Sequence, residues 1–370
     1  MAISSQPPGL DSPVARLAWS WRSGRLRRYR HLAGAVLSTI PNWFRLLLLQ
    51  LDCRLHGRRL VTVALVEHFG DIVACEPVAR HLRRNRPGAC IAWCLRAPYR
   101  ELIRHNSNVD KVLIVGCLTE WIFLRKSGLA GEVVDLHLRG RQCPLCWVPL
   151  QKQEGDPGLN INNYYNFGSL LQASAQSAGL GALEDSRPRL YLPAAAVEAV
   201  DRLNLPEEFI VFHARANESE RDWDNEKWAA LLELVRQDLK VATVEIGLSA
   251  VAPSASPGYR NLCGRTGLLE LGEVIRRASV FVGLDSGPAH LGNAAGTPGV
   301  ILLGRYRSFR RYLPYSGGYG DGTLAKLIYA DGLTASLSVG EVYAVVADFW
   351  KRRRLSALEP SAAVNLKTNP

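Results

Sequence analysis

The chain has 370 residues, which is enough for two ordinary domains of about 150 residues each and an additional segment. Its hydrophobic fraction of 47%, with 32 glycines and 20 prolines, fits a soluble α/β protein and excludes a disordered or fibrous chain. The net charge is +11, of which residues 1–60 carry +8, and this concentration at one end argues against a nucleic-acid partner, whose binding face would be spread through the fold.

The first element is a basic segment, residues 1–58, that also contains aromatic residues: Trp19, Trp21, Trp43 and Phe44. This composition predicts contact with an anionic membrane surface. In residues 31–51, Pro41, Asn42 and Arg45 interrupt the apolar run, so the segment is expected to lie on the membrane rather than to cross it. Two alternatives remain open, a helical extension packed on the protein's own surface and a late-starting twin-arginine export signal.

A first set of alternating strands and helices follows. Strands are expected at 58–68, 89–95, 110–115 and 132–138, with helices at 71–87, 99–106 and 119–127 between them. Short apolar strands that alternate with helices predict a parallel sheet covered on both faces. We assign residues 59–195 to this N-terminal, Rossmann-like domain.

The pattern restarts after a proline-containing connection at 187–208. Strands are expected at 209–215, 241–247, 279–287 and 299–304, with helices at 225–239 and 268–278. Residues 196–370, with a terminal helix, form the predicted second domain. The sequence thus predicts two doubly wound α/β domains facing a cleft, and such sheets bind ligands at the carboxyl ends of their strands.

The eight cysteines show no spacing typical of a disulfide framework, so reduced thiols in a cytoplasm are expected. Cys143 and Cys146 form a lone C-x-x-C pair. A structural zinc site normally has four ligands, and no second pair lies at the usual spacing. We therefore interpret the pair as a packing feature and expect no metal.

The stretch VFVGLDSGPAHLGNAAGTPGVILLG, residues 280–304, holds six glycines between two apolar runs. A helix is expected to begin near Gly287, which places Asp285 and Ser286 in the preceding turn and His290 on the first helical turn. Free N–H groups at a helix start bind phosphate well, and glycine permits close approach. The alternative is that Asp285 or Ser286 caps the helix and His290 is incidental.

This stretch resembles the donor-site signature of glycosyltransferase family 9, the ADP-heptose:lipopolysaccharide heptosyltransferases. Three other stretches resemble the family in the same order: VALVEHFGDIVACEPVARHLRRNRPGACIAW, ERDWDNEKWAALLELV and NLCGRTGLLELGEVIRRASVFVG. The resemblance runs from about residue 60 to about residue 305, and residues 1–58 have no counterpart in it.

The resemblance implies a GT-B fold and an enzyme that transfers a sugar with inversion and without a required metal or other cofactor. The donor would be a nucleotide sugar, ADP-heptose by family, and the acceptor lipopolysaccharide or another lipid-linked envelope glycan. Such an enzyme would be peripheral to the cytoplasmic face of the inner membrane, where both substrates are available.

The resemblance also assigns residues. Asp71, after Gly70 at the end of the first strand, matches the family's general base, with helix capping as the alternative role. Arg221 matches a basic residue expected to hold the diphosphate. His137 stands where the family often has a glutamine, so an acceptor contact is implied for it and for Gly70, although a structural role for His137 is equally open.

One strand end departs from the family's pattern, because Arg215 and Ala216 replace the usual small hydroxyl residues there. The donor site is therefore expected to comprise Arg215, Arg221, Asp285, Ser286, Gly287 and His290. The triplet at 222–224 is Asp-Trp-Asp, and some metal sites use Asp-x-Asp. About one triplet of this form is expected by chance in a chain with this many aspartates, so it does not predict a metal.

Two rival functions were weighed against transfer of a sugar. A dinucleotide-dependent oxidoreductase should carry G-x-G-x-x-G after the first strand, and the chain has a single glycine there. A non-catalytic descendant that acts as a membrane-associated scaffold in envelope polysaccharide assembly remains open, because the phosphate pocket departs from the usual pattern.

Overall fold

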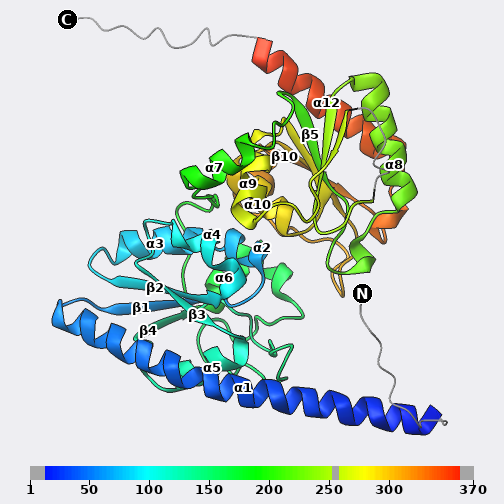
Figure 1. Ribbon diagram of the computed structural model, residues 1–370. Helices are drawn as coiled ribbons and strands as arrows, with labels where there is room; N and C mark the ends of the chain where they lie inside the picture. The colour runs from blue at the N-terminus through cyan, green and yellow to red at the C-terminus, as the bar shows by residue number, and fades with distance from the viewer. Residues whose placement is uncertain (1–12, 252–257, 359–370) are drawn as a thin grey trace, which may run out of the picture.

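The computed structural model describes residues 13–251 and 258–358 and contains two parallel sheets, each covered by helices on both faces (Figure 1). The predicted α/β architecture of two doubly wound halves is therefore confirmed. The predicted strands all form, most of them shorter by a few residues than expected.

The N-terminal sheet has the strand order β3-β2-β1-β4. Its strands are β1 (Leu60–Ala64), β2 (Cys90–Arg96), β3 (Lys111–Val115) and β4 (Glu132–Asp135). One face is covered by α2 (Phe69–Ala74), α3 (Pro77–Asn85), α4 (Arg100–Arg104) and α6 (Leu170–Ser177), and the other by α1 (Pro13–Leu55) and α5 (Leu118–Lys126). The single helix expected at 71–87 is divided before Pro77, which lacks the N–H needed to continue the helical hydrogen bonds and instead starts α3.

The second sheet has the order β10-β9-β8-β5-β6-β7. Its strands are β5 (Phe209–His213), β6 (Ala242–Ile246), β7 (Tyr259–Asn261), β8 (Val280–Leu284), β9 (Gly299–Leu303) and β10 (Ala325–Tyr329). Its helices are α7 (Ala194–Asp201), α8 (Asn225–Leu234), α9 (Leu268–Arg277), α10 (Gly287–Ala295), α11 (Gly317–Gly320) and α12 (Val339–Leu358). The edge strands β7 and β10 were not predicted, since β7 is short and polar and neither carries a long apolar run.

Short 3₁₀ turns connect several of these elements, at Ala97–Tyr99, Tyr164–Phe167, Ser219–Arg221 and Thr334–Ser336. The helix expected at 225–239 ends as one π turn, Val235–Leu239. Lys240 follows it in the left-handed conformation that closes many helices.

The N-terminal segment forms one long helix, α1, that continues through Pro41. Its inward residues recur at alternating steps of four and three: Arg28, Leu32, Ala35, Thr39, Asn42, Leu46, Leu49 and Cys53. Leu46 is fully buried, and buried Asn42 donates to the Ile114 carbonyl (2.9 Å) and to Glu120. The helix therefore forms part of the cover of the N-terminal sheet, the alternative that the sequence had left open.

A second apolar stripe on α1 faces outward: Leu37, Ile40, Phe44, Leu48, Leu51 and Leu55 are exposed. Within the described part of the chain, Gly24–Leu55 has the length and hydropathy to cross a membrane, although only 17% of its most apolar window is buried. Pro41 does not break the helix, and Arg45 donates to Asn42, which bonds to the domain, so these three residues interrupt the apolar run in the sequence but not the helix itself.

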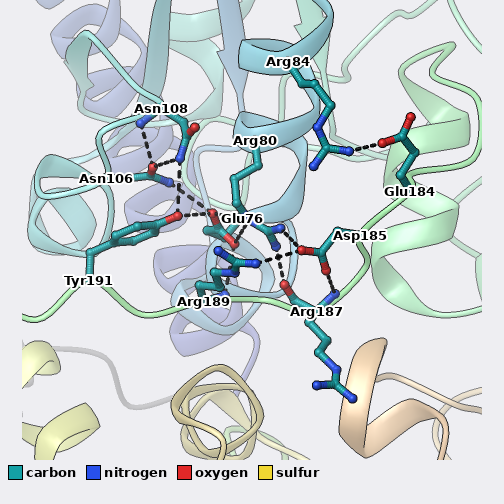
Figure 2. Close-up of polar contacts among 10 residues, drawn as sticks. All are labelled: Glu76, Arg80, Arg84, Asn106, Asn108, Glu184, Asp185, Arg187, Arg189 and Tyr191. Carbon is teal, nitrogen blue, oxygen red and sulfur yellow. Dashed lines mark hydrogen bonds and ion pairs between the residues drawn. The ribbon is translucent and has the colours of Figure 1, made fainter. Parts of the chain in front are cut away.

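The connection between the two halves is fixed by a buried ion-pair network (Figure 2). Glu76 accepts hydrogen bonds from Arg80 (3.1 and 3.2 Å), from the Tyr191 hydroxyl (2.9 Å) and from the backbone N–H of Arg189 (3.0 Å). Arg80 also contacts Asp185, just before the connecting segment. Because the connecting segment supplies Arg189 and Tyr191, two of these three Glu76 partners, the network holds it against α3.

An Arg80→Met variant is expected to lose about 3 kcal/mol of stability, because Glu76 would remain buried without its cation. For a domain of this size, that loss lowers the melting temperature by about 6 °C or more in differential scanning calorimetry. The matched control is Arg84→Met, whose partner Glu184 is exposed, and its melting temperature should stay within about 1 °C. Equal effects of the two substitutions would contradict the role given to the network.

Candidate functional site

The two sheets bring their topological switch points to the same region of the molecule. In the first sheet the order reverses between β1 and β4, and in the second between β5 and β8. Ligands of such sheets bind outside the carboxyl ends of the strands at these points. The segments after β1 and β8 begin α2 and α10, which pack against each other between the two halves (Figure 1).

Two glycines permit the close approach of α2 and α10. A Cβ atom on Gly70 would lie 3.0 Å from Gly287 Cα and 3.1 Å from His290 Cδ2. A Cβ atom on Gly287 would overlap the ring of Phe69, which lies against the start of α10. Gly70 is therefore a packing glycine between the two halves in this structure, and the acceptor contact implied for it has no support in these contacts.

Asp71 is partly exposed and occupies the third position of α2. Its carboxylate forms no hydrogen bond or ion pair with any described residue. The alternative of helix capping is wrong, because His68 is the residue at the capping position and no side chain caps α2. Asp71 lies close enough to His290 to oppose the lowering of that residue's pKa, which burial causes. The structure thus leaves a carboxylate without a partner beside the start of α10.

Asp285 is buried at the end of β8 and its carboxylate is surrounded by donors. The hydroxyls of Tyr312 (2.7 Å) and Tyr315 (3.0 Å) donate to it, and Arg221 Nη1 lies 3.3 Å from Oδ2. Burial together with the Asp285 charge raises the pKa of both tyrosines above the usual range. Asp285 therefore holds the positions of other side chains and is not free to contact a ligand itself.

Arg221 is largely buried, and Glu218 Oε2 lies 3.9 Å from its Nε. Its Nη1 donates to the Asp285 backbone carbonyl (3.1 Å), and its guanidinium lies 4.8 Å from the ring centroid of Tyr306. Its Nε is buried and forms no hydrogen bond with the described residues. Burial disfavours the cation, but Asp285 raises the pKa of Arg221 above its ordinary value, so the charge is retained. A positioned cation with a spare donor suits an anionic ligand.

Ser286 follows β8 and contacts His213 at the end of β5, so it links the two strands of the second switch point. Its Oγ donates to the Leu284 carbonyl (3.0 Å) and lies 3.0 Å from His213 Nδ1. Burial lowers the pKa of His213 to about 4, so its ring is neutral near pH 7 and donates to Ser286. Ser286 occupies the N-cap position of α10, as the capping alternative expected, but its side chain forms no capping hydrogen bond. His213 was not predicted as a site residue, although it ends β5 and ligands were expected at the carboxyl ends of the strands.

His290, on the first turn of α10, is also buried, and its ring centroid lies 4.8 Å from that of Tyr315. Arg215 is 44% exposed and pairs with Asp222 at 3.5 Å, on the solvent side of the loop. Of the residues expected at the donor site, Arg221, Asp285, Ser286, Gly287 and His290 are thus brought together, whereas Arg215 forms its ion pair with Asp222.

His137 has no free ring nitrogen for an acceptor. Its Nδ1 lies 2.7 Å from Asp135 Oδ1, and its Nε2 accepts a hydrogen bond from the Val66 N–H at 3.0 Å. The acceptor contact implied for His137 is therefore not supported, and the structural alternative accounts for it. The Asp135 carboxylate also accepts from Trp121 Nε1 (3.0 Å), so this pair is part of the core.

Two features near the site were missed from the sequence. Glu67, after β1, has a buried carboxylate with no hydrogen bond among the described residues, and Arg141 (3.7 Å) and Arg96 (3.9 Å) lie near it. Across from it, aromatic rings from both halves pack together: Tyr164, Tyr165, Tyr306, Phe309 and Tyr312. Neither feature follows a motif, because each forms only when distant segments meet.

The triplet at 222–224 does not form a joint carboxylate site. Asp222 accepts the Ala216 N–H (2.7 Å), and Asp224 pairs with Lys227 (3.4 Å). Trp223 is buried between them, and its Nε1 donates to the Leu337 carbonyl (3.0 Å).

Comparison with known proteins identifies the second half most directly. Residues 172–317 match the model of glycosyltransferase family 9 (heptosyltransferase). Over 114 residues, 28% of this chain, the sequence is 27% identical to lipopolysaccharide heptosyltransferase 3 of Escherichia coli K12. That alignment spans 33% of the relative, and a second E. coli protein of the same name is spanned over 41% of its length. The predicted resemblance to glycosyltransferase family 9 is confirmed.

Solved structures extend the likeness of fold to most of the chain. The family 9 glycosyltransferase of Veillonella parvula has a TM-score of 0.61 at 17% identity, covering 80% of this chain and 98% of that one. The E. coli ADP-heptose lps heptosyltransferase II has a TM-score of 0.57 at 17% identity, covering 80% and 99%. These likenesses confirm the expected two-domain glycosyltransferase fold. The unit that carries Asp71 lies outside the matched residues 172–317.

Proposed function

Starting from the resemblance to glycosyltransferase family 9, we propose that this protein transfers a heptose from a nucleoside diphosphate donor, ADP-heptose, to a lipopolysaccharide acceptor. The observation that carries the proposal is that a carboxylate without an ion pair and a buried arginine lie near the same residue, His290, between the halves. The Asp71 carboxylate has no partner among the described residues, and the Arg221 cation keeps an Nε–H that forms no hydrogen bond, with Glu218 Oε2 3.9 Å from Nε. A base and an anion-binding donor are the two groups that such a transfer requires.

On the donor side, the proposed role of Arg221 is to hold the diphosphate. Asp285 and Tyr306 fix the guanidinium from two directions, so little side-chain freedom is lost when the donor binds. The start of α10 would add N–H groups and a partial positive charge. Ser286 and His213, which are bonded to each other, would line the same end of the sheet.

On the acceptor side, the proposed role of Asp71 is that of a general base. Its carboxylate would remove the proton of the acceptor hydroxyl as that oxygen attacks the anomeric carbon. The bond from that carbon to the diphosphate breaks on the opposite face, and the diphosphate leaves with the electron pair. The configuration at the anomeric carbon is thereby inverted, and Arg221 stabilises the departing charge.

The function is tested with purified full-length protein and two substrates, ADP-heptose and heptose-deficient lipopolysaccharide. Release of ADP that depends on the acceptor would support the proposal. Binding of ADP-heptose without turnover in either the wild type or an Asp71→Asn variant would instead favour the non-catalytic scaffold. A thermal-shift series over ADP, UDP and GDP identifies the nucleotide, because a ligand at 100 times its Kd stabilises the folded state by about 2.7 kcal/mol.

We further propose that the outward stripe of α1 lies on the cytoplasmic face of the inner membrane. Apolar side chains would enter the lipid, and the nearby arginines would contact anionic headgroups. The inward stripe packs on the N-terminal sheet, so α1 would not cross the bilayer as a separate helix. An acceptor anchored in the same membrane would then be within reach of the cleft.

A Phe44→Glu/Leu48→Glu double variant is expected to bind anionic liposomes at least about 10-fold more weakly in a sedimentation assay, because two exposed apolar anchors are lost. Raised salt should weaken the wild type as well. The control is Leu248→Glu, which replaces a 92% exposed leucine in the second half and should leave liposome binding unchanged. Wild-type protein that ignores anionic liposomes at low salt, or that only detergent extracts, would contradict this proposal.

A further inference from the structure

Three buried cysteines from two distant parts of the N-terminal half meet beside α5. Cys117 directly precedes α5, and Cys143 and Cys146 lie in the loop that follows β4. Their sulfur atoms all lie within 4.8 Å of one another, and all three residues are at most 5% exposed. The sequence had presented a lone C-x-x-C pair, and the fold supplies a third thiol from 26 positions before it.

The loop around Cys143 is folded back on its own sulfur. The Trp147 N–H donates to the Cys143 carbonyl (2.8 Å), and the Cys143 N–H donates to the Val148 carbonyl (3.0 Å). The backbone N–H groups of Leu145 and Cys146 point at the Cys143 sulfur. Such N–H groups can hydrogen-bond to a sulfur that binds a metal and hold it in place.

A fourth group completes the surroundings of the sulfurs. Thr119, on the first turn of α5, is fully buried, and its hydroxyl has no regular hydrogen bond among the described residues. Its neighbours are the sulfurs of Cys143 and Cys146. The hydroxyl can donate to those sulfurs and lies where it could also bond to an oxygen ligand held beside them.

We propose that Cys117, Cys143 and Cys146 bind one thiophilic metal ion of the zinc type, with the fourth coordination position beside Thr119. Zinc takes thiolate ligands at about 2.3 Å in tetrahedral geometry, which separates the sulfurs by roughly 3.8 Å. The observed spacing needs only a small contraction to reach that value. Each thiol loses its proton to solvent on binding.

The other uses of three thiols fit less well. A disulfide would join only two of them and leave the third beside an unpartnered hydroxyl. Iron–sulfur clusters are generally held by four thiolates, and the described residues offer three here. Simple packing of thiols accounts for their burial but not for the N–H groups directed at the Cys143 sulfur.

The site would have a structural role in joining α1 to the domain. Arg28, on α1, donates from Nε to the Cys146 carbonyl at 3.0 Å, and its guanidinium lies 5.1 Å from the ring centroid of Trp147. Three thiolates on a divalent ion carry a net charge of −1, and this guanidinium would offset it. Metal binding would thus fix the loop on which α1 rests.

The first test is metal analysis of full-length protein purified without a metal-binding tag. We expect elemental mass spectrometry to find about one zinc per chain in the wild type. The zinc content should fall below about 0.2 per chain in Cys117→Ser and in Cys143→Ser. The control, Cys263→Ser, removes a thiol outside the cluster and should keep the full metal content. Iron in place of zinc, lost in the same variants, would still support the three-thiolate site.

The second test needs no variant and so does not depend on whether the serine substitutions fold. X-ray absorption at the metal edge of the wild type should show about three sulfur neighbours near 2.3 Å and one lighter neighbour at about 2.0 to 2.1 Å. A wild type without bound metal that also fails to take up zinc or cobalt would overturn the proposal. A Cys143–Cys146 disulfide in the freshly purified chain, or metal content unchanged by both substitutions, would do the same.

Discussion

An Asp71→Asn variant is expected to bind the donor as well as the wild type but to turn over about 10²-fold more slowly, or worse. The substitution keeps the size of the side chain and removes only its ability to accept a proton. The Asp71 carboxylate has no ion-pair partner among the described residues, so no structural contact is lost with the charge. The measurement is acceptor-dependent release of nucleoside diphosphate in single-turnover conditions, with donor affinity from calorimetry.

Glu67→Gln is the matched control, because Glu67 is the other carboxylate without a hydrogen bond near the end of β1. Arg96 and Arg141 lie within ion-pair distance of Glu67, which suits a carboxylate that orients neighbours. A large loss of turnover in Glu67→Gln, with wild-type rates in Asp71→Asn, would move the base to Glu67. Wild-type rates in both variants would show that neither carboxylate at this edge of the sheet accepts the proton.

The second large effect is expected from Arg221→Gln, which should weaken donor binding about 10- to 100-fold. A charge-assisted hydrogen bond to phosphate contributes about 1.5 to 3 kcal/mol, and the glutamine removes the cation that makes it. Asp285 keeps its two tyrosine donors, so the fold should persist. Isothermal titration with ADP and with ADP-heptose gives the affinities.

Arg236→Gln serves as the reference for this experiment, since Arg236 is a surface arginine of the same half that pairs with Glu233 within one helix. Its donor affinity should equal that of the wild type. An unchanged Kd for ADP in Arg221→Gln would contradict the assigned diphosphate contact. Gly287→Val would be a poor probe of donor binding, because the ring of Phe69 already lies where the valine would project.

Most strands were predictable because they are short apolar runs, some of them buried on both faces, as β1 and β8 are in full. The turn after β8 was also predictable, because its glycines and Asp285 follow such a run directly. The double role of α1 was not, since apolar residues on both faces obscure the spacing of the buried stripe. Inward Leu46 and outward Leu48 look alike in sequence, and only packing distinguishes them.

The other features that were not predicted are contacts between segments far apart in the chain. Nothing near Cys143 indicates that Cys117 lies beside it, and nothing near Asp285 indicates that Tyr312 and Tyr315 donate to it. For His137 the family resemblance implied an acceptor contact and left a structural role equally open. Its two ring nitrogens bond to residues within its own sheet.

The two stripes of α1 also define a distance. The helix lies on one face of the N-terminal sheet, and α2, which carries Asp71, lies on the other (Figure 1). Layers of secondary structure pack about 10 Å apart, so the reacting group would be held roughly 20 Å above a lipid surface that α1 touches. The anchor would thus set the height of the reacting group above the membrane. It would favour glycans whose growing end projects by that length from the bilayer, and would pass over sugars attached closer to the lipid.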